Sequence, residues 1–255
     1  MKYTVITGAS SGIGYETALA FASRGKNLIL AARRTEELEN LKSKLTEINS
    51  ELDIIIRTVD LSVTANVYEF YESIRNYQIE TWINNAGFGN FASVGEQNLN
   101  KIETMLHLNI EALTILSSLY VRDYAKVEGT QIINVSSGGG YLIVADAVTY
   151  CATKFYVSAF TEGLAHELKE NGSAMQAKVL APAATATEFG KRSIDADEFQ
   201  YEGVVPKFHT AKEMAGFMLE LYDSTKVVGI VNGETYEFLL RDPIYPYVTR
   251  TRKDS

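Results

Sequence analysis

The chain has 255 residues, of which 46% are hydrophobic and 22% are charged, the composition of an ordinary globular protein. Its net charge of −8 argues against nucleic acid or an anionic membrane surface as a partner. A single cysteine excludes an internal disulfide, and three scattered histidines provide no metal-site spacing, so we expect no metal. No signal peptide precedes the first strand and no apolar run could span a bilayer, so we expect a cytoplasmic protein.

Short apolar segments alternate with helical segments along the chain. The apolar segments have the length and composition of buried parallel strands. Repeated strand–helix units imply a parallel sheet with helices on both faces and a ligand at the carboxyl ends of the strands. We therefore predict an α/β fold, a three-layer doubly wound parallel sheet of the Rossmann type, as a single domain over residues 1–255. The expected strands are 2–7, 27–31, 53–58, 81–84, 131–135, 177–181 and 227–231, and the expected helices are 13–24, 35–48, 64–77, 101–126, 149–171 and 211–223.

A glycine-rich turn joins the first expected strand to the first expected helix. It reads Gly8-Ala-Ser-Ser-Gly12-Ile-Gly14. Glycines allow a tight turn and close approach of the backbone to a pyrophosphate, and the helix N-terminus presents unpaired N–H groups to the anion. A purely structural turn could carry the same glycines, but the place between strand and helix favours a dinucleotide site.

The charge at the end of the second expected strand indicates which dinucleotide is bound. In sites that prefer NAD, an acidic residue near this point bonds the ribose 2′-hydroxyl. Here the strand ends Ala32-Arg33-Arg34, and no acid comes before Glu36. Guanidinium groups bind phosphate as a planar fork, so we predict NADP(H) in preference to NAD(H). We assign the 2′-phosphate to Arg33 ahead of Arg34, with help from Ser10, although one arginine could simply begin an amphipathic helix.

Ser137, Tyr150 and Lys154 carry the clearest chemistry. Tyr150 and Lys154 are four residues apart and so share one face of a helix. A neighbouring ammonium favours the phenolate, so we expect Lys154 to lower the pKa of Tyr150 and allow proton exchange with a carbonyl or alcohol oxygen. Ser137, thirteen residues before Tyr150, would hold that oxygen, with Ser136 as the second candidate. The Tyr–Lys spacing alone is weak, because residues 222–226 repeat it without a serine at the matching place.

Five motifs stand in order along the chain: Thr7-Gly-Ala-Ser-Ser-Gly-Ile-Gly14, Asn84-Asn-Ala-Gly87, Asn109, Ser137 and Tyr150-x-x-x-Lys154. Together they resemble the compact single-domain branch of the short-chain dehydrogenase/reductase family, over residues 1 to about 190. The resemblance implies an NADP-dependent oxidoreductase that interconverts a small-molecule carbonyl and an alcohol by hydride transfer. It also implies a homodimer or homotetramer, built through the long helices 101–126 and 149–171.

The resemblance also assigns a role to each matching residue. Lys154 would hold the nicotinamide ribose, and Asn109 would distort its helix and hold a water that links Lys154 to solvent. Without the resemblance, Asn109 could equally be a buried amide satisfied by backbone. Asp60 would accept a hydrogen bond from the exocyclic amine of adenine. The expected cofactor contacts are Gly8, Ser10, Ser11, Gly12, Ile13, Gly14, Arg33, Arg34, Asp60, Leu61, Asn84, Ala86, Gly87, Tyr150, Lys154, Pro182, Thr185 and Thr187, and the expected catalytic residues are Asn109, Ser137, Tyr150 and Lys154.

Two segments depart from the family pattern. Pro182 is followed by Ala183 where the family usually has glycine, which restricts the backbone near the nicotinamide and leaves the roles of Thr185 and Thr187 open. The segment 227–233 lacks the glycine pair found in many carrier-protein ketoreductases, which weakens the alternative of a 3-oxoacyl-thioester reductase.

We expect a substrate loop at about 183–210, with specificity in 188–210. The polar and glycine content of this stretch suits a mobile lid. We expect the basic segment 250–253, Arg-Thr-Arg-Lys, to be a disordered end of the chain. Side chains that could cover an apolar substrate, unless they are ordinary packing residues, are Phe189, Phe199, Tyr201 and Phe208 on the lid and Tyr141, Leu142 and Ile143 opposite.

Two other classes of function remain as alternatives. A catalytically idle dinucleotide-binding sensor or scaffold would not need the Ser137–Tyr150–Lys154 set. A nucleotide-sugar epimerase or dehydratase usually carries a G-x-x-G-x-x-G turn and a larger C-terminal region, whereas the glycines here stand at 8, 12 and 14.

Overall fold

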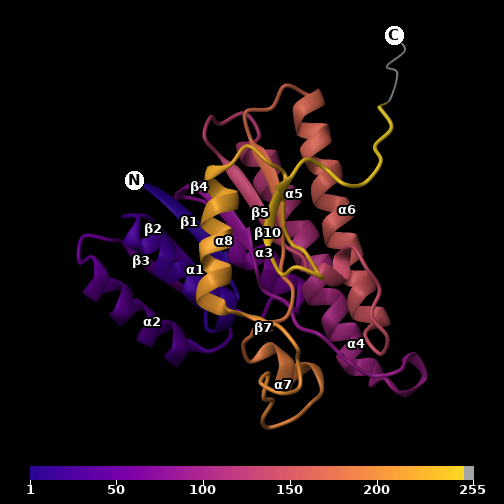
Figure 1. Cartoon of the computed structure of the whole chain (residues 1–255). Coiled ribbons are helices and arrows are strands. Elements are labelled where there is room, and N and C mark those ends of the chain that lie inside the picture. The colour runs from indigo at the N-terminus through magenta and orange to yellow at the C-terminus, as the bar shows by residue number, and fades with distance from the viewer. Residues whose placement is uncertain (250–255) are drawn as a thin grey trace.

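The structure is a computed structural model that describes residues 1–249, so the basic segment 250–253 lies outside it. Within these residues, eight strands form one central sheet between two layers of helices (Figure 1). Every pairing in this sheet is parallel except that of β10 with β9. The strands are Lys2–Thr7 (β1), Asn27–Ala32 (β2), Ile54–Thr58 (β3), Gln78–Asn84 (β4), Gln131–Val135 (β5), Gln176–Ala181 (β6), Val228–Val231 (β9) and Phe238–Arg241 (β10).

The order of the strands places the ligand site. It runs β3-β2-β1-β4-β5-β6-β9-β10, so the chain reverses its direction of travel across the sheet between β1 and β4. At such a switch point the loops that follow neighbouring strands diverge, which opens a crevice at the carboxyl ends. The predicted α/β doubly wound fold is confirmed.

Each face of the sheet has its own apolar core. Helices α1, α2 and α8 cover one face, where Phe21, Leu41 and Met218 are buried, and α3, α5 and α6 cover the other, where Trp82 and Tyr120 are buried. Both faces of the strands are therefore apolar, which explains their continuous apolar sequences. The helices are Gly12–Ser23 (α1), Thr35–Ile48 (α2), Thr64–Ser73 (α3), Leu99–Leu106 (α4), Leu113–Tyr124 (α5), Val148–Glu170 (α6), Phe189–Ser193 (α7) and Ala211–Asp223 (α8).

The structure departs from the expected elements at several places. The helix expected over 101–126 is divided by a π-helix at His107–Ala112 between α4 and α5. The expected lid contains α7, and a short pairing of Thr185–Ala186 (β7) with His209–Thr210 (β8) closes its base. The edge strand β10 was not predicted, because a four-residue strand that pairs with one neighbour has little sequence signal.

Helix α8 is held at both ends by polar side chains. At its start, Thr210 and Glu213 form a capping box, in which each side chain bonds the other residue's backbone N–H. At its end, Lys178 of β6 is buried and its Nζ donates to the carbonyl oxygens of Leu221, Tyr222 and Ser224, at 2.6–3.1 Å. The last carbonyls of a helix lack the usual intrahelical donors, and Lys178 bonds three of them, of which that of Leu221 also accepts from the Ser224 N–H and hydroxyl. None of the described helices is long and apolar enough to cross a membrane.

Candidate active site

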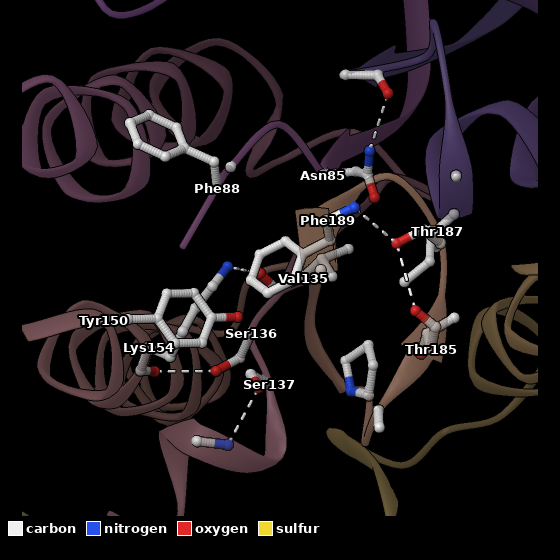
Figure 2. Close-up of a pocket in the computed structure, with 18 of the residues that line it drawn as sticks. Asn85, Phe88, Val135, Ser136, Ser137, Tyr150, Lys154, Thr185, Thr187 and Phe189 are labelled. Carbon is white, nitrogen blue, oxygen red and sulfur yellow. Dashed lines mark hydrogen bonds between the residues drawn. The ribbon is translucent and has the colours of Figure 1, made fainter. Parts of the chain in front are cut away.

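Tyr150 and Lys154 lie on one face of α6 and open onto a cavity of about 1200 Å³. Both are nearly buried, with 7% of Tyr150 and 5% of Lys154 exposed. The Lys154 ammonium donates to the carbonyl oxygen of Val135 at 2.9 Å and lies 5.9 Å from the centre of the Tyr150 ring (Figure 2). Ser137 follows β5 and also lines the cavity. The fold thus brings the three predicted residues together on one wall.

The two candidate serines differ in how their hydroxyls are used. Ser136 is buried, and its Oγ bonds the carbonyl oxygen of Lys154 at 2.9 Å and the Oγ of Ser158 at 2.7 Å. Ser137 accepts from the backbone N–H of Gly139 and points toward Tyr150. Since the Ser137 hydroxyl faces Tyr150 and the cavity, whereas that of Ser136 is bonded to buried groups, Ser137 is the better placed to bond a substrate oxygen.

The protonation state of the site is governed mainly by burial. Burial raises the pKa of Tyr150 well above its usual value, and its interaction with the Ser137 hydroxyl opposes the rise. Burial also lowers the pKa of Lys154 to about 8. The expectation that Lys154 lowers the pKa of Tyr150 is thus wrong for the protein by itself, because the ammonium is directed at Val135 and burial dominates. The phenol is protonated at neutral pH and is therefore ready to donate.

Two aromatic side chains enclose the Tyr150 ring. Phe91 and Phe189 have ring centres 5.9 Å and 5.4 Å from that of Tyr150, and 6.1 Å from each other. Figure 2 shows the Phe189 ring beside Tyr150. Phe189 was expected from its place in the lid, whereas Phe91 belongs to a loop that carried no motif and was missed. Together they make the surroundings of the phenol apolar.

Asn109 lies behind the cavity wall, in the π-helix between α4 and α5. Its amide nitrogen donates to the carbonyl oxygen of Phe88 and to Thr153, and its Oδ1 accepts from the Phe88 backbone N–H. A Cβ added at Gly87 would lie 3.0 Å from this Oδ1 and 3.5 Å from the Lys154 Nζ, so both atoms face Gly87. Asn109 does not line the cavity. The helix is distorted at this residue, as the resemblance implied.

The glycine-rich turn forms the other end of the cavity. Gly8 has φ +69°, and a Cβ there would meet the backbone of Ala86 at 2.8 Å, so glycine is required. Gly14 packs instead against Asn85 and the Gly8 carbonyl and does not line the cavity. The predicted cofactor residues that do line it are Gly8, Ser10, Ser11, Gly12, Ile13, Arg33, Arg34, Asp60, Leu61, Ala86, Gly87, Tyr150, Lys154, Pro182, Thr185 and Thr187.

The prediction for Asn84 requires correction. Its side chain is buried, accepts from the Trp82 indole, and donates to Ser117 and Asn134. It therefore ties β4 to β5 and α5, and it does not line the cavity. Asn85, which we did not select, lines the cavity and donates to the Thr7 and Gly8 carbonyl oxygens. Successive residues of a strand point to opposite faces, and the sequence did not show which of the two asparagines faces the crevice.

The two arginines after β2 have different surroundings. Arg33 is 59% exposed at its side chain and has one distant ion pair, with Asp60 at 4.0 Å. Arg34 donates to the carbonyl oxygen and hydroxyl of Ser10 and pairs with Glu188 at 3.1 Å. Glu188 also pairs with Arg192, so Arg34 is joined to the lid through one carboxylate. Of the two arginines, Arg33 is therefore the more available to an added phosphate.

Asp60 is suited to accept a hydrogen bond. Its burial alone would raise its pKa, but bonds from the Ser62 hydroxyl and N–H, together with the charge of Arg33, hold the pKa below its usual range. The carboxylate is thus ionised at neutral pH.

Ala183 does not strain the backbone after β6. Among the described residues, those other than glycine with positive φ are Asp146, Asp195 and Tyr236, so Ala183 occupies an ordinary conformation. The neighbouring Thr187 packs against Gly12, since a Cβ on Gly12 would lie 3.1 Å from its methyl group. Thr187 therefore lies beside the start of α1. The Thr185 hydroxyl instead donates to the Ala183 carbonyl oxygen.

The substrate end of the cavity is mostly apolar. Of the side chains expected there, Phe189, Phe199, Tyr201, Tyr141 and Leu142 line it, and Phe208 and Ile143 do not. The structure adds Phe91 and residues from beyond α8, among them Leu239 and Ile244. No motif marks these C-terminal residues, so sequence reasoning had no means to place them. The described residues contain no group of three or more His, Cys, Asp or Glu that could hold a metal ion.

Comparison with known proteins agrees with this geometry. A family model described as short chain dehydrogenase matches residues 2–198. An uncharacterized oxidoreductase of Staphylococcus saprophyticus is 31% identical over 198 residues, which are 77% of this chain and 79% of that protein. Dehydrogenase/reductase SDR family member 11 of Bos taurus is 29% identical over 202 residues, again 77% of this chain and 79% of that protein.

Two solved structures share both fold and sequence. A short-chain dehydrogenase from Sphingobium yanoikuyae, in complex with NADPH, has 30% identity and a TM-score of 0.81, with 90% of this chain and 87% of that chain covered. The bulky-bulky ketone specific alcohol dehydrogenase from Comamonas testosteroni has 28% identity and a TM-score of 0.78, with 90% and 86% covered. The chain belongs to the short-chain dehydrogenase/reductase family, as its motifs predicted, and is a nucleotide-binding oxidoreductase of that family.

Proposed function

We propose that this protein is an NADP(H)-dependent reductase of bulky, apolar ketones that also runs the reverse oxidation of the alcohols. The observation that carries the proposal is a single cavity with Ser137, Tyr150 and Lys154 at one end and the glycine-rich turn and Arg33 at the other. The related enzyme from Comamonas testosteroni is specific for ketones with two bulky substituents, and this cavity is similarly lined by aromatic and aliphatic side chains.

The residues present fit a dinucleotide. Gly8 and Gly12 have no side chains, so a pyrophosphate can approach the backbone closely at the start of α1. The N–H groups and the helix dipole there favour the anion. Arg33 is exposed and would bind the 2′-phosphate, and Asp60 would accept from adenine. The preference for NADP(H) is supported by the missing acidic residue after β2 and by the NADPH complex of the Sphingobium yanoikuyae relative. When bound, the nicotinamide supplies or accepts the hydride.

The chain's own residues handle the oxygen and the proton. The Ser137 hydroxyl donates a hydrogen bond to the carbonyl oxygen and orients it. Tyr150, protonated at neutral pH, gives its proton to that oxygen as the alcohol forms. Lys154, whose ammonium lies 5.9 Å from the Tyr150 ring centre, would hold the nicotinamide ribose, while Phe91 and Phe189 exclude water from the phenol. Oxidation follows the same steps in reverse.

The proposal is tested by the consumption of NADPH with a panel of ketones and aldehydes of increasing size. Tyr150→Phe should lower kcat by about 10²–10⁴, because it removes the proton donor and leaves the fold unchanged. Tyr222→Phe is the matched control, since Tyr222 and Lys226 have the same spacing outside the site. Tight NADPH binding without turnover of any carbonyl would favour a sensor instead, and full activity of Tyr150→Phe would disprove the assigned role.

We further propose a cytoplasmic homodimer or homotetramer that uses the outer face of α5 and α6. Tyr156 and Phe160 of α6 stack there, with ring centres 5.9 Å apart, and the Tyr156 hydroxyl bonds Thr114 of α5. Light scattering coupled to size-exclusion chromatography tests this assembly, and a monomer at all concentrations would contradict it.

A further inference from the structure

Helix α6 carries a buried carboxylate that the proposed chemistry does not use. Tyr150, Lys154, Ser158 and Glu162 follow one another at intervals of four residues and therefore share a face of the helix. Glu162 is 1% exposed. A carboxylate so deeply buried is costly unless its oxygens accept hydrogen bonds, so its partners indicate what it is for.

Glu162 accepts hydrogen bonds from two segments far away in the sequence. One oxygen accepts from the Tyr141 hydroxyl at 2.6 Å. The other accepts from the backbone N–H groups of Ile244 and Tyr245, at 2.5 Å and 2.8 Å. We name residues 242–249 the C-terminal strap. In Figure 1 it is the yellow stretch that leaves β10 and passes over α6.

The two segments held by Glu162 also contact each other. The Tyr245 hydroxyl donates to the Gly140 carbonyl oxygen at 2.5 Å, and the rings of Tyr141 and Tyr245 stack with centres 5.4 Å apart and planes 14° apart. Gly140 and Tyr141 directly continue the turn that begins at Ser137. The strap is thereby joined to the loop that carries the catalytic serine.

The strap belongs to the substrate end of the cavity. Ile244 and Tyr141 both line the cavity, whereas Glu162 lies behind them and does not. The family model matches residues 2–198, so the strap lies outside the part of the chain that this model describes. A wall supplied from there is suited to select substrates.

We propose that Glu162 is a positioning residue that clamps the C-terminal strap to the Ser137 loop and thereby sets the size of the substrate end of the cavity. The inference rests on the proposed reductase function. A carboxylate suits this task because both its oxygens are acceptors only, which matches three donors. A glutamine of the same size has one acceptor oxygen and no charge, so it cannot accept from both the Tyr141 hydroxyl and the strap N–H groups, and its bonds are weaker than those of a carboxylate.

The direct test is hydrogen exchange of the strap in Glu162→Gln, which requires no turnover. The backbone amides of Ile244 and Tyr245 should exchange about tenfold faster or more, because the neutral amide oxygen that replaces the carboxylate is a weaker acceptor. Glu170→Gln is the matched control, since Glu170 also lies on α6 and accepts from the strap, through the Tyr247 hydroxyl. It should leave the exchange of Ile244 and Tyr245 unchanged. Unaltered exchange in a folded Glu162→Gln protein would disprove the clamp.

The second test concerns selectivity. In Glu162→Gln, the KM ratio between a ketone with two bulky substituents and one of the size of acetone should change by about fivefold or more. The Kd for NADPH should stay the same, because the bonds of Glu162 to the strap and to Tyr141 involve none of the predicted cofactor residues. If KM changes equally for both ketones, or the NADPH Kd changes as much as KM, Glu162 supports only the general fold and the proposal fails.

Tyr245→Phe keeps the ring and removes the bond to Gly140, so it tests the same clamp if Glu162→Gln does not fold. It should shift the KM ratio in the same direction, and no shift would overturn the proposal. If the wild-type protein reduces no ketone, the proposed function fails, while the exchange measurement still decides whether Glu162 holds the strap.

Discussion

The pair of Tyr150 and Lys154 shows how burial modifies the chemistry of two adjacent side chains. Burial favours the neutral form of both groups, so it raises the pKa of the phenol and lowers that of the ammonium. The phenol is thereby kept as a proton donor, and the lysine is brought to a pKa of about 8, near the working range. The limit on activity at high pH is therefore expected from Lys154.

The pH profile of ketone reduction tests this assignment. Because the lowered pKa of Lys154 means that its charge is lost as the pH rises past about 8, kcat/KM should be level below that pH and fall above it. Lys154→Arg retains the charge throughout, so its profile should lack this fall even though its kcat is lower. The profiles are measured from about pH 6 to 10 at constant ionic strength. An identical fall in both proteins would assign the limit to another group.

Arg33 and Arg34 allow a second prediction at the scale of single residues. Arg33→Ala should raise the KM for NADPH by about tenfold or more while the KM for NADH changes little, because a charge-assisted contact to the 2′-phosphate is lost. Arg34→Ala should have the smaller effect on this ratio, since Arg34 is engaged by Ser10 and Glu188. The measurement is the ratio of kcat/KM for the two cofactors. A larger effect from Arg34→Ala would reverse the assignment.

Single elements are held in place by polar contacts that bridge distant segments. Lys178 of β6 closes the end of α8, and Asn84 joins β4 to β5 and α5. Glu188 at the start of α7 pairs with Arg34 after β2, which ties the lid to the cofactor-binding loop. Lys178 and Asn84 thereby bond buried polar groups, whereas the Glu188–Arg34 pair is about one-third exposed.

Lys178→Met should therefore destabilise the protein. Methionine fills a similar volume but removes the bonds to the carbonyl oxygens of Leu221, Tyr222 and Ser224, of which Leu221 still accepts from Ser224. The loss should cost about 2–4 kcal/mol in the free energy of unfolding. Lys226→Met removes an exposed ion pair with Asp242 and should cost less than about 1 kcal/mol. Urea unfolding measures both. Equal costs would show that the Lys178 bonds do not stabilise α8.

At the scale of the whole molecule, one cavity joins loops from both halves of the sheet to the lid and the C-terminal strap. A ligand that fills it contacts all of these segments in the folded state and none of them in the unfolded state. Binding should therefore stabilise the entire fold.

Thermal unfolding with added cofactor tests this coupling without turnover. At about 100 times its Kd, NADP⁺ should add about 2.7 kcal/mol, which raises Tm by roughly 5–10 °C for a protein of this size. NAD⁺ at the same concentration should raise Tm less, and Tyr150→Phe should retain most of the NADP⁺ effect. An equal shift with both cofactors would remove the basis for the NADP(H) preference.

The sequence by itself determined the fold class and the main catalytic wall. Apolar strands that alternate with helices predicted the parallel sheet, and the i,i+4 spacing placed Tyr150 and Lys154 on one face, because both patterns depend on neighbours along the chain. The glycine-rich turn at Gly8 could be predicted from the sequence for the same reason, since its glycines lie in one short segment.

The tertiary structure decided what depends on distant residues. Whether Asn84 or Asn85 faces the cavity, whether Arg34 is engaged by Glu188, and how far burial shifts the pKa of Tyr150 all depend on packing between separate elements. Glu162 and Ile244 are 82 residues apart, and no local pattern connects them. Burial and hydrogen bonding of this kind arise only when the sheet brings its loops together, which is why a single sequence does not reveal them.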